Sequence, residues 1–492
     1  MTDTPALAMD AETFRAIGYR AVDLAAAHLA GMREAPVFQP MPPEVRQGLL
    51  DLPLPETGGD PEVILAQFAT EVLPWPMGNG HPRFFGWVNS PPAPMGAIAE
   101  LLAAAMGPSC AGGDHAATYL ERGVTRWLME LIGFPVAGSM GLLVSGGSMA
   151  SLTALAAARQ RAAQQDGWDV RARGLGAWGS GLRLYLSSEA HTTLRKAAEL
   201  LGLGTDSVRV IPVDDAFRID LPALKAAIAA DRDAGLRPFC VIGSAGTVST
   251  GAIDPLAELA DLCAAEGLWF HVDGAYGAVG VLDPVVAEAY AGLDRADSIA
   301  LDPHKWLSVP VECGCALVRD AALLRDTFSM VPAYLRTEEG RGFGGLPWFA
   351  EYGFQQTRGF RALKLWMTIQ HAGRSGLSAM IARQNALARR LAELVAADPD
   401  MELLAEVTLS ICCFRFVPRE QQMDDAALDA LNKRIMETVQ SGGAAFLTQA
   451  LVQSRFALRA NVLHYATTEA DLEALLAAVR TAAQAATSRV NW

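Results

Sequence analysis

Five short segments of the chain carry residue types that could do chemistry, and each follows a run of apolar residues. The first is Ser145-Gly146-Gly147-Ser148. Glycines let backbone N–H groups approach a phosphate closely, and a helix that begins there adds a favourable dipole. Gly147 and Ser148 are therefore candidate phosphate ligands. A Gly-rich turn between a strand and a helix also occurs without any ligand, so both interpretations stay open.

A second and a third segment place ionisable side chains after apolar runs. His271 and Asp273 are two residues apart, so on a strand they share a face. A buried Asp273 would need a partner, such as a protonated ring nitrogen, a helix cap or a core salt bridge. Lys305, within Asp302-Pro303-His304-Lys305-Trp306, becomes nucleophilic if it is partly desolvated near other cations. A lone lysine more often reaches the surface.

The fourth and fifth segments offer an imidazole and hydroxyl groups. His191 ends the stretch Ser187-Ser188-Glu189-Ala190-His191, where its ring could stack on a flat ligand or simply be hydrogen-bonded. Thr247 lies in the loop 245–251, whose hydroxyls could contact a ligand or belong to an ordinary polar loop. Neither segment decides between its two interpretations alone.

The apolar runs before these segments alternate with Ala-rich runs of helical character. This alternation predicts an α/β fold with a mostly parallel sheet covered by helices. Ligands of such sheets bind beyond the carboxyl ends of the strands, which is where the five segments fall. The expected strands are 141–144, 182–186, 208–212, 239–242, 268–272 and 298–301, and the expected helices are 149–163, 194–201, 221–230 and 256–265.

The two ends of the chain have a different character. Residues 11–31 predict an amphipathic helix capped by Asp10, and a proline-rich stretch with a short helix at 61–73 follows. This arm has little core of its own, so we expect it to pack on something else, a partner subunit being one candidate. Expected helices at 359–373, 380–396, 424–441 and 469–485, with strands at 410–416 and 456–462, predict a small α+β part. The predicted division is 1–80 (arm), 81–374 (large domain) and 375–492 (small domain).

Composition excludes several classes of protein. Of 492 residues, 51% are hydrophobic and 19% charged, so a large core is expected. The net charge of −14 argues against a nucleic-acid partner. The start lacks a basic region, and the longest uncharged stretch, after Arg83, contains Gly86 and three prolines, so we expect neither a signal peptide nor a membrane span. Seven cysteines without a CxxC pair predict reduced thiols in a cytoplasmic protein and no metal site.

Taken in chain order, the segments resemble the fold-type-I pyridoxal-phosphate enzymes, specifically the group II amino-acid decarboxylases, which include the aromatic-L-amino-acid decarboxylases. The resemblance runs over most of the chain, and the HVDGAYG and DPHKW motifs are its most specific parts. The matching stretches are HPRFFGWVNS (81–90), VSGGSMASLTALAAAR (144–159), AGTVSTGAIDP (245–255), FHVDGAYGA (270–278), LDPHKWL (301–307), FRALKLW (360–366) and FALRANV (456–462).

The resemblance implies a role for each candidate residue toward pyridoxal 5'-phosphate. Lys305 would form the internal aldimine, and Asp273 would keep the pyridine nitrogen protonated. His191 would stack on the ring. The other implied contacts are Gly147 and Ser148 with the phosphate, His304 nearby, Thr247 and Ala275 along the cleft, and Tyr334 as the loop tyrosine that protonates the substrate carbon. It also implies a homodimer with swapped N-terminal arms.

The implied activity is decarboxylation of an L-amino acid to the amine and CO2. Aromatic-specific members have a bulky apolar wall where this chain has small residues at 107–113, followed by Asp114 and His115. If these two residues line the pocket, we expect a larger or more polar substrate; if they lie on the surface, this expectation lapses.

Four alternatives to decarboxylation stay open at this stage, one of them a non-catalytic scaffold that kept the fold. Two are other reactions of the same cofactor and fold, oxidative aldehyde synthesis and transamination. The fourth is a non-haem iron oxygenase, because His271 and Asp273 with a later histidine (304, 371 or 464) imitate a two-His-one-carboxylate site. That site usually lies on an antiparallel jelly roll, whereas this chain alternates strands with helices.

Overall fold

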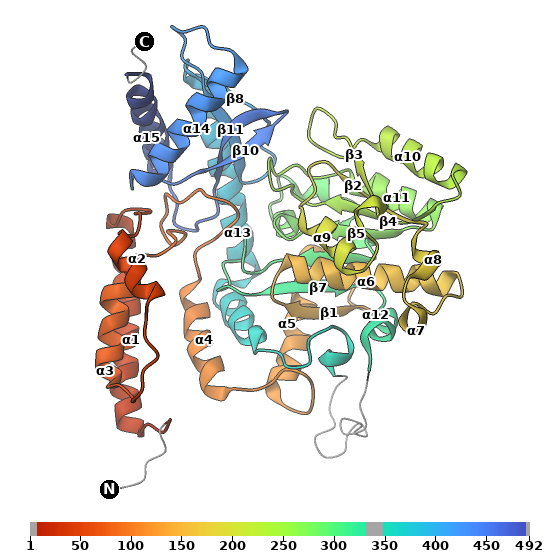
Figure 1. Cartoon of the computed structure of the whole chain (residues 1–492), viewed down its shortest axis with the longest axis horizontal. Helices are drawn as coiled ribbons and strands as arrows, with labels where there is room; N and C mark the ends of the chain where they lie inside the picture. Colours follow the sequence, from red (N-terminus) through yellow and green to blue (C-terminus); the bar gives the residue numbers. More distant parts are fainter. Residues whose placement is uncertain (1–6, 331–347, 489–492) are drawn as a thin grey trace.

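The computed structural model describes residues 7–330 and 348–488. Within these residues, a seven-stranded sheet in the order β1-β7-β6-β5-β4-β2-β3 forms the centre of the molecule (Figure 1). Strands β2 to β6 run parallel, while β7 is antiparallel to both β1 and β6. The strands are β1 Met140–Val144, β2 Leu182–Ser187, β3 Val208–Ile211, β4 Arg237–Ser244, β5 Trp269–Asp273, β6 Ser298–Leu301 and β7 Gly314–Val318. The predicted α/β fold class is confirmed.

Helices cover both faces of this sheet and bury two separate apolar cores. One core combines the sheet with apolar side chains of α6, α9 and α12, and the other with those of α5, α10, α11 and α13. Two-sided burial explains why the strands read as continuous apolar runs rather than alternating ones. The helices are α5 Ala116–Ile132, α6 Gly147–Gln165, α7 Val170–Arg173, α8 Gly176–Gly179, α9 Thr193–Leu200, α10 Leu221–Asp233, α11 Leu256–Glu266, α12 Ala321–Phe328 and α13 Arg361–Ala397.

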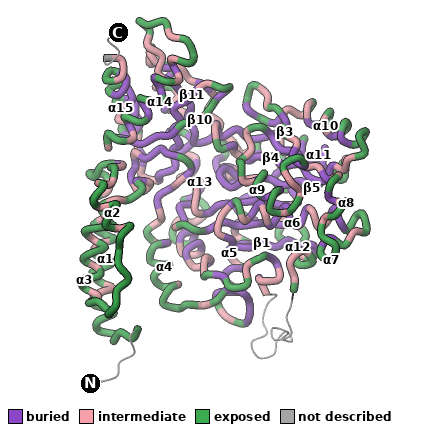
Figure 2. The backbone as a smooth tube through the Cα atoms, in the orientation of Figure 1, coloured by how far each residue is buried: buried purple, intermediate pink, exposed green. Residues whose placement is uncertain are grey.

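The N-terminal arm stands beside the large sheet as a layer of its own (Figure 1). It contains α1 Ala11–Gly31, α2 Pro43–Leu50 and α3 Pro61–Gln67, with a π-helical turn at Phe68–Val72, and α4 Pro94–Met106 follows. Asp10 caps α1 as predicted, accepting hydrogen bonds from the N–H groups of Glu12 and Thr13. None of α1, α2 and α3 contains a buried residue, and Figure 2 shows the arm as almost wholly accessible.

The C-terminal part is built on a four-stranded antiparallel sheet in the order β10-β11-β9-β8. Its elements are β8 Met401–Leu403, β9 Ile411–Phe416, α14 Asp425–Ser441, β10 Thr448–Val452, β11 Arg455–Asn461 and α15 Glu469–Ser488. Helix α13 connects this part to the large sheet, and Gly373, with φ 64° and ψ 166°, interrupts it. The helices predicted at 359–373 and 380–396 are thus one element with a break between them.

Two further observations concern the whole described chain. All seven cysteines are buried and unpaired, in agreement with the predicted reduced thiols. Among the described residues, we find no helix with the length and apolar character needed to cross a bilayer.

Candidate active site

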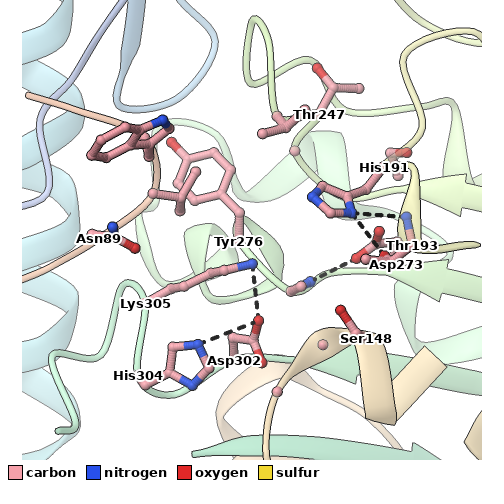
Figure 3. A pocket seen from close by; sticks show the side chains of 18 of the residues that line it. Asn89, Ser148, His191, Thr193, Thr247, Asp273, Tyr276, Asp302, His304 and Lys305 are labelled. Carbon is pink, nitrogen blue, oxygen red and sulfur yellow. Dashed lines mark hydrogen bonds and ion pairs between the residues drawn. The ribbon is translucent and has the colours of Figure 1, made fainter. Parts of the chain in front are cut away.

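A cavity of about 370 Å³ lies where the parallel strands end, and segments from five strands converge on it (Figure 3). Of the nine residues predicted for the site, eight line this cavity: Gly147, Ser148, His191, Thr247, Asp273, Ala275, His304 and Lys305. The ninth, Tyr334, lies outside the described residues. The sheet therefore brings together residues that lie as far apart in the chain as Gly147 and Lys305.

The Gly/Ser turn forms one wall of the cavity at the beginning of α6. A Cβ atom on Gly147 would lie 2.8 Å from Ala275 Cβ and 2.9 Å from Asp302 Oδ2, so only glycine fits there. Ser148 is exposed and faces the cavity. Backbone N–H groups at the beginning of a 19-residue helix, with a hydroxyl beside them, suit a phosphate.

Lys305 enters the cavity from the loop after β6, and its amine has a specific partner. Lys305 Nζ lies 2.9 Å from Asp302 Oδ2. Asp302 is 4% exposed, and its other oxygen, Oδ1, has no hydrogen-bond partner among the described residues. The lysine is therefore held by a buried carboxylate and does not reach out to the surface.

Asp273 ends β5 and presents its carboxylate to the same cavity. Its Oδ1 accepts a hydrogen bond from the N–H of Ala275 (3.2 Å), and its carbonyl accepts one from the N–H of Ala245 (2.9 Å). These contacts fix the strand end and turn the carboxylate toward the cavity that Lys305 also enters (Figure 3).

Two histidines complete the polar lining. His191 Nδ1 accepts a hydrogen bond from the N–H of Thr193 (3.2 Å) and lies 2.8 Å from Thr193 Oγ1. The loss of surrounding water lowers the pKa of His191, Asp273 opposes that change, and Lys305 adds to it. His304 Nδ1 accepts from the N–H of Cys313 (3.0 Å), and desolvation lowers the pKa of His304 as well. Both rings are therefore neutral at neutral pH.

Sequence reasoning missed several lining residues, among them Trp87, Asn89, Tyr276 and Asp302. Trp87 has a left-handed φ of 44°, and its carbonyl accepts hydrogen bonds from Arg459 and Asn461 of β11. Tyr276 stacks on Trp306 with ring centroids 5.0 Å apart. All four lie inside stretches that carry the family resemblance, and that position was the signal that could have found them.

His271 does not serve the cavity. Its ring is fully buried, with Nδ1 2.9 Å from Ser298 Oγ and Nε2 3.4 Å from Ser151 Oγ. Burial lowers the pKa of His271 to about 4. In the described part of the chain, no group of three or more His, Cys, Asp or Glu side chains is arranged to hold a metal ion. The iron site imitated by the sequence is therefore not assembled around His271 and Asp273.

Asp114 and His115 also lie away from the cavity lining. Asp114 accepts a hydrogen bond from the hydroxyl of Tyr119 (2.6 Å), and His115 Nε2 lies 3.1 Å from Thr118 Oγ1. Both contacts are local to the beginning of α5. Within residues 7–330 and 348–488, neither Asp114 nor His115 lines the cavity. The polar pocket wall that they would have formed is therefore not part of it.

The set of side chains fits pyridoxal phosphate group by group. An aldehyde can react with the Lys305 amine, a pyridine nitrogen can pair with Asp273, and a phosphate can bind at the turn of Gly147 and Ser148. A cavity of this volume lies within the usual range for a small ligand. One contact is discordant, because the Asp302 carboxylate lies directly against Gly147.

Comparison with known proteins also indicates a pyridoxal-phosphate enzyme. Residues 42–417 match the model of the pyridoxal-dependent decarboxylase conserved domain. The chain is 32% identical over 480 residues to the aromatic-L-amino-acid decarboxylase of Bacillus atrophaeus, covering 97% of each protein. It is 34% identical to the L-2,4-diaminobutyrate decarboxylase of Rhizobium meliloti, over 85% of this chain and 81% of the other.

Two further similarities bear on reaction and cofactor. The phenylacetaldehyde synthase of Arabidopsis thaliana is 28% identical, over 92% of this chain and 92% of its own. The crystal structure of Oryza sativa TDC with PLP and tryptamine superposes with a TM-score of 0.90 and 27% identity, covering 98% of this chain and 99% of that one.

Proposed function

The chain belongs to the pyridoxal-dependent decarboxylase family, and on that premise we propose that it removes the α-carboxylate of an L-amino acid with Lys305 as the cofactor-bearing residue. The protein is a carboxy-lyase and its cofactor is pyridoxal phosphate. The observation that carries the assignment of residues is the convergence of Lys305 and Asp273 on one cavity.

Pyridoxal phosphate, when bound, supplies the electron-withdrawing system that accepts the electron pair left behind as CO2 departs. The chain's own residues bind and orient the cofactor and favour the protonated form of its ring nitrogen. The Lys305 amine gives the covalent attachment, and Asp273 favours a protonated ring nitrogen by placing a negative charge beside it. His191, neutral because desolvation lowers its pKa, offers a flat face for stacking. Gly147 and Ser148 hold the phosphate through backbone N–H and hydroxyl donors.

We propose an amino acid with an aromatic side chain as the first substrate class to test. Trp87, Val88 and Tyr276 give the cavity an apolar wall, and one relative that aligns over 97% of both chains is an aromatic-L-amino-acid decarboxylase. The diaminobutyrate decarboxylase among the relatives makes basic side chains the second class. A CO2-release screen over all common amino acids and hydroxylated aromatic ones distinguishes them, and no release from any would contradict the activity.

The outcome of the reaction needs its own assay, because a phenylacetaldehyde synthase is among the relatives. We propose plain decarboxylation, with Tyr334 as the donor of a proton to the substrate carbon. An amine yield equal to the CO2 yield supports it. Sustained aldehyde and peroxide would identify an oxidative aldehyde synthase, and a requirement for a keto acid would identify a transaminase.

We further propose that the protein works as a homodimer joined through the N-terminal arm. The arm helices α1 and α3 bury no residue within one chain, while they expose Phe14, Val22, Val63 and Ile64. A second copy would cover this apolar surface. The division into 1–80, 81–374 and 375–492 stays a prediction, and the unpaired buried thiols support the cytoplasmic location that we propose.

A further inference from the structure

The charge of Asp302, a residue of the cavity lining, conflicts with the proposed phosphate position. Its Oδ2 atom would lie 2.9 Å from a Cβ on Gly147, which places the carboxylate directly behind the turn. Its N–H donates to the carbonyl of Ala275 (3.2 Å), and its carbonyl accepts from the N–H of Lys305 (2.9 Å), so the residue cannot easily move away. A phosphate held by that turn would bring a second negative charge close to a buried first one.

Within residues 7–330 and 348–488, the closest cation to Asp302 is Lys305, the residue that the cofactor engages in the proposed function. Lys305 Nζ lies 2.9 Å from Oδ2, whereas His304 Nε2 lies 3.8 Å away and belongs to a ring whose pKa desolvation lowers. The other oxygen, Oδ1, is buried without a hydrogen-bond partner among the described residues. Titratable groups that interact electrostatically with this region or line the cavity with it are Lys305, His304, His191, Asp273, Glu189, Tyr276, Cys313 and Lys364.

Cofactor attachment changes this balance, given the proposed function of Lys305. The Lys305 ammonium first gives up one proton, and its nitrogen then forms a bond to the aldehyde carbon. The two remaining hydrogens leave with the aldehyde oxygen as water, so atoms and charge balance. Asp302 thereby loses its ammonium partner while a phosphate arrives beside it. A buried carboxylate without a partner is strongly unfavourable and tends to become neutral.

We propose that Asp302 takes up a proton when pyridoxal phosphate binds and then holds it as a neutral carboxyl group against the Gly146–Gly147 turn. The Lys305 ammonium, 2.9 Å from Oδ2, is the nearest source of that proton. A neutral carboxyl group has one O–H donor, which can serve the phosphate and removes the like-charge repulsion. Because the proton passes from Lys305 to Asp302 and is not released to solvent, cofactor affinity in the wild type loses the rise with pH that attachment to a lysine ammonium would otherwise show.

Infrared difference spectroscopy of the protein with and without pyridoxal phosphate tests the proposal directly. The wild type should gain the C=O stretch of a protonated carboxyl group on binding, and Asp302→Asn should lack that band. Glu189→Gln is the matched control, since Glu189 is another carboxyl group lining the same cavity, and it should keep the band. A wild type without the band, or a band that persists in Asp302→Asn, would overturn the proposal.

Cofactor affinity gives a second, independent readout. The dissociation constant of Asp302→Asn should fall by up to about tenfold per pH unit as the pH rises, because attachment then releases one proton to solvent, whereas that of the wild type should change little. Asp302→Ser serves if the asparagine variant does not fold. Equal pH slopes in wild type and variant contradict the role of Asp302. CO2 release by the same wild-type preparation tests the proposed function separately, so the two failures are distinguishable.

Discussion

Arg358 and Glu121 form an ion pair in the interior, and both also bind the backbone of Leu143. Arg358 Nη1 lies 3.0 Å from Glu121 Oε2, and the two residues are 3% and 0% exposed. The N–H of Leu143 donates to Glu121 Oε1 (3.0 Å), while its carbonyl accepts from Arg358 Nη2. Since β1 is an edge strand, the pair takes the place of a second neighbouring strand. Leu143 is three residues before Gly146, so the pair fixes the strand that leads into the Gly/Ser turn.

Arg358→Met should destabilise the protein severely, because it leaves the Glu121 carboxylate buried and unpaired. The expected loss is about 3–5 kcal/mol in the free energy of unfolding. Arg126→Met is the matched control, since Arg126 pairs with Glu130 at a surface where both side chains are more than half exposed. Its cost should stay within about 0–1 kcal/mol. Urea unfolding of the two variants measures the difference, and equal losses would show that burial of the pair is unimportant.

The sequence predicted those parts of the site that follow strands. Apolar runs before Ser145, Ser187 and Asp302 are local signals, and the sheet places their ends at one edge, so six of its strands were found. Strand β7 was missed because the short run Gly314–Val318 follows the polar loop of Lys305 closely. Local sequence pattern alone could not place Trp87, since its position depends on Arg459, 372 residues away. The ion pair of Arg358 with Glu121 could not be predicted either, because no periodic pattern in the sequence links the two residues.

Lys305→Ala should abolish turnover and the visible absorbance of the protein with pyridoxal phosphate. The variant lacks the amine that forms the covalent attachment, while the rest of the cavity lining is unchanged. An absorbance spectrum after dialysis against the cofactor, together with a CO2 assay, checks both. Lys225→Ala is the matched control, because Lys225 is exposed on α10. A coloured, active Lys305→Ala protein would move the attachment to another lysine.

Asp273→Asn should retain the cofactor but lose about 100-fold or more in kcat. Asparagine keeps the shape of the side chain and removes the negative charge that favours a protonated ring nitrogen; removing one partner of a buried charge pair costs roughly 2–5 kcal/mol. Steady-state kinetics on the best substrate, with absorbance to confirm cofactor content, provide the measurement. Asp261→Asn, at a side chain that is 71% exposed, is the control. Unchanged kcat in Asp273→Asn would mean that the carboxylate serves only the fold.

Protein stability should fall as the pH drops below about 6.5, in part because of His464. His464 Nε2 donates to the carbonyl of Gly80 (2.8 Å), and Nδ1 accepts from the N–H of Ala466 (2.9 Å), so only the neutral ring satisfies both contacts. Burial lowers the pKa of His464 to about 4. The unfolded chain takes up a proton at about pH 6.5 while the folded one does not, which favours unfolding by up to about 1.4 kcal/mol per pH unit between 6.5 and 4.

Chemical unfolding at a series of pH values isolates that contribution. His464→Asn should be less stable than wild type at pH 8, because a buried hydrogen-bonded ring is lost. Its stability should decline less steeply than that of wild type between pH 6.5 and 4, since one proton-linked group is gone. Parallel declines in the two proteins would assign the acid sensitivity to other groups.

Charged residues on the arm should convert the proposed dimer to a monomer. Phe14 on α1 and Ile64 on α3 are 56% and 55% exposed, and the double change Phe14→Asp with Ile64→Asp places two carboxylates in the apolar surface that a second copy would cover. Desolvating those charges opposes association, while α1 and α3 have no residue buried within the single chain whose packing could be lost. Sedimentation velocity should show a dimer for wild type and a monomer for the double variant.

Leu200→Asp, at a 75% exposed position on α9, is the control and should stay dimeric. A wild type that sediments as a monomer, or a double variant that remains a dimer, would place the subunit contact elsewhere or remove it.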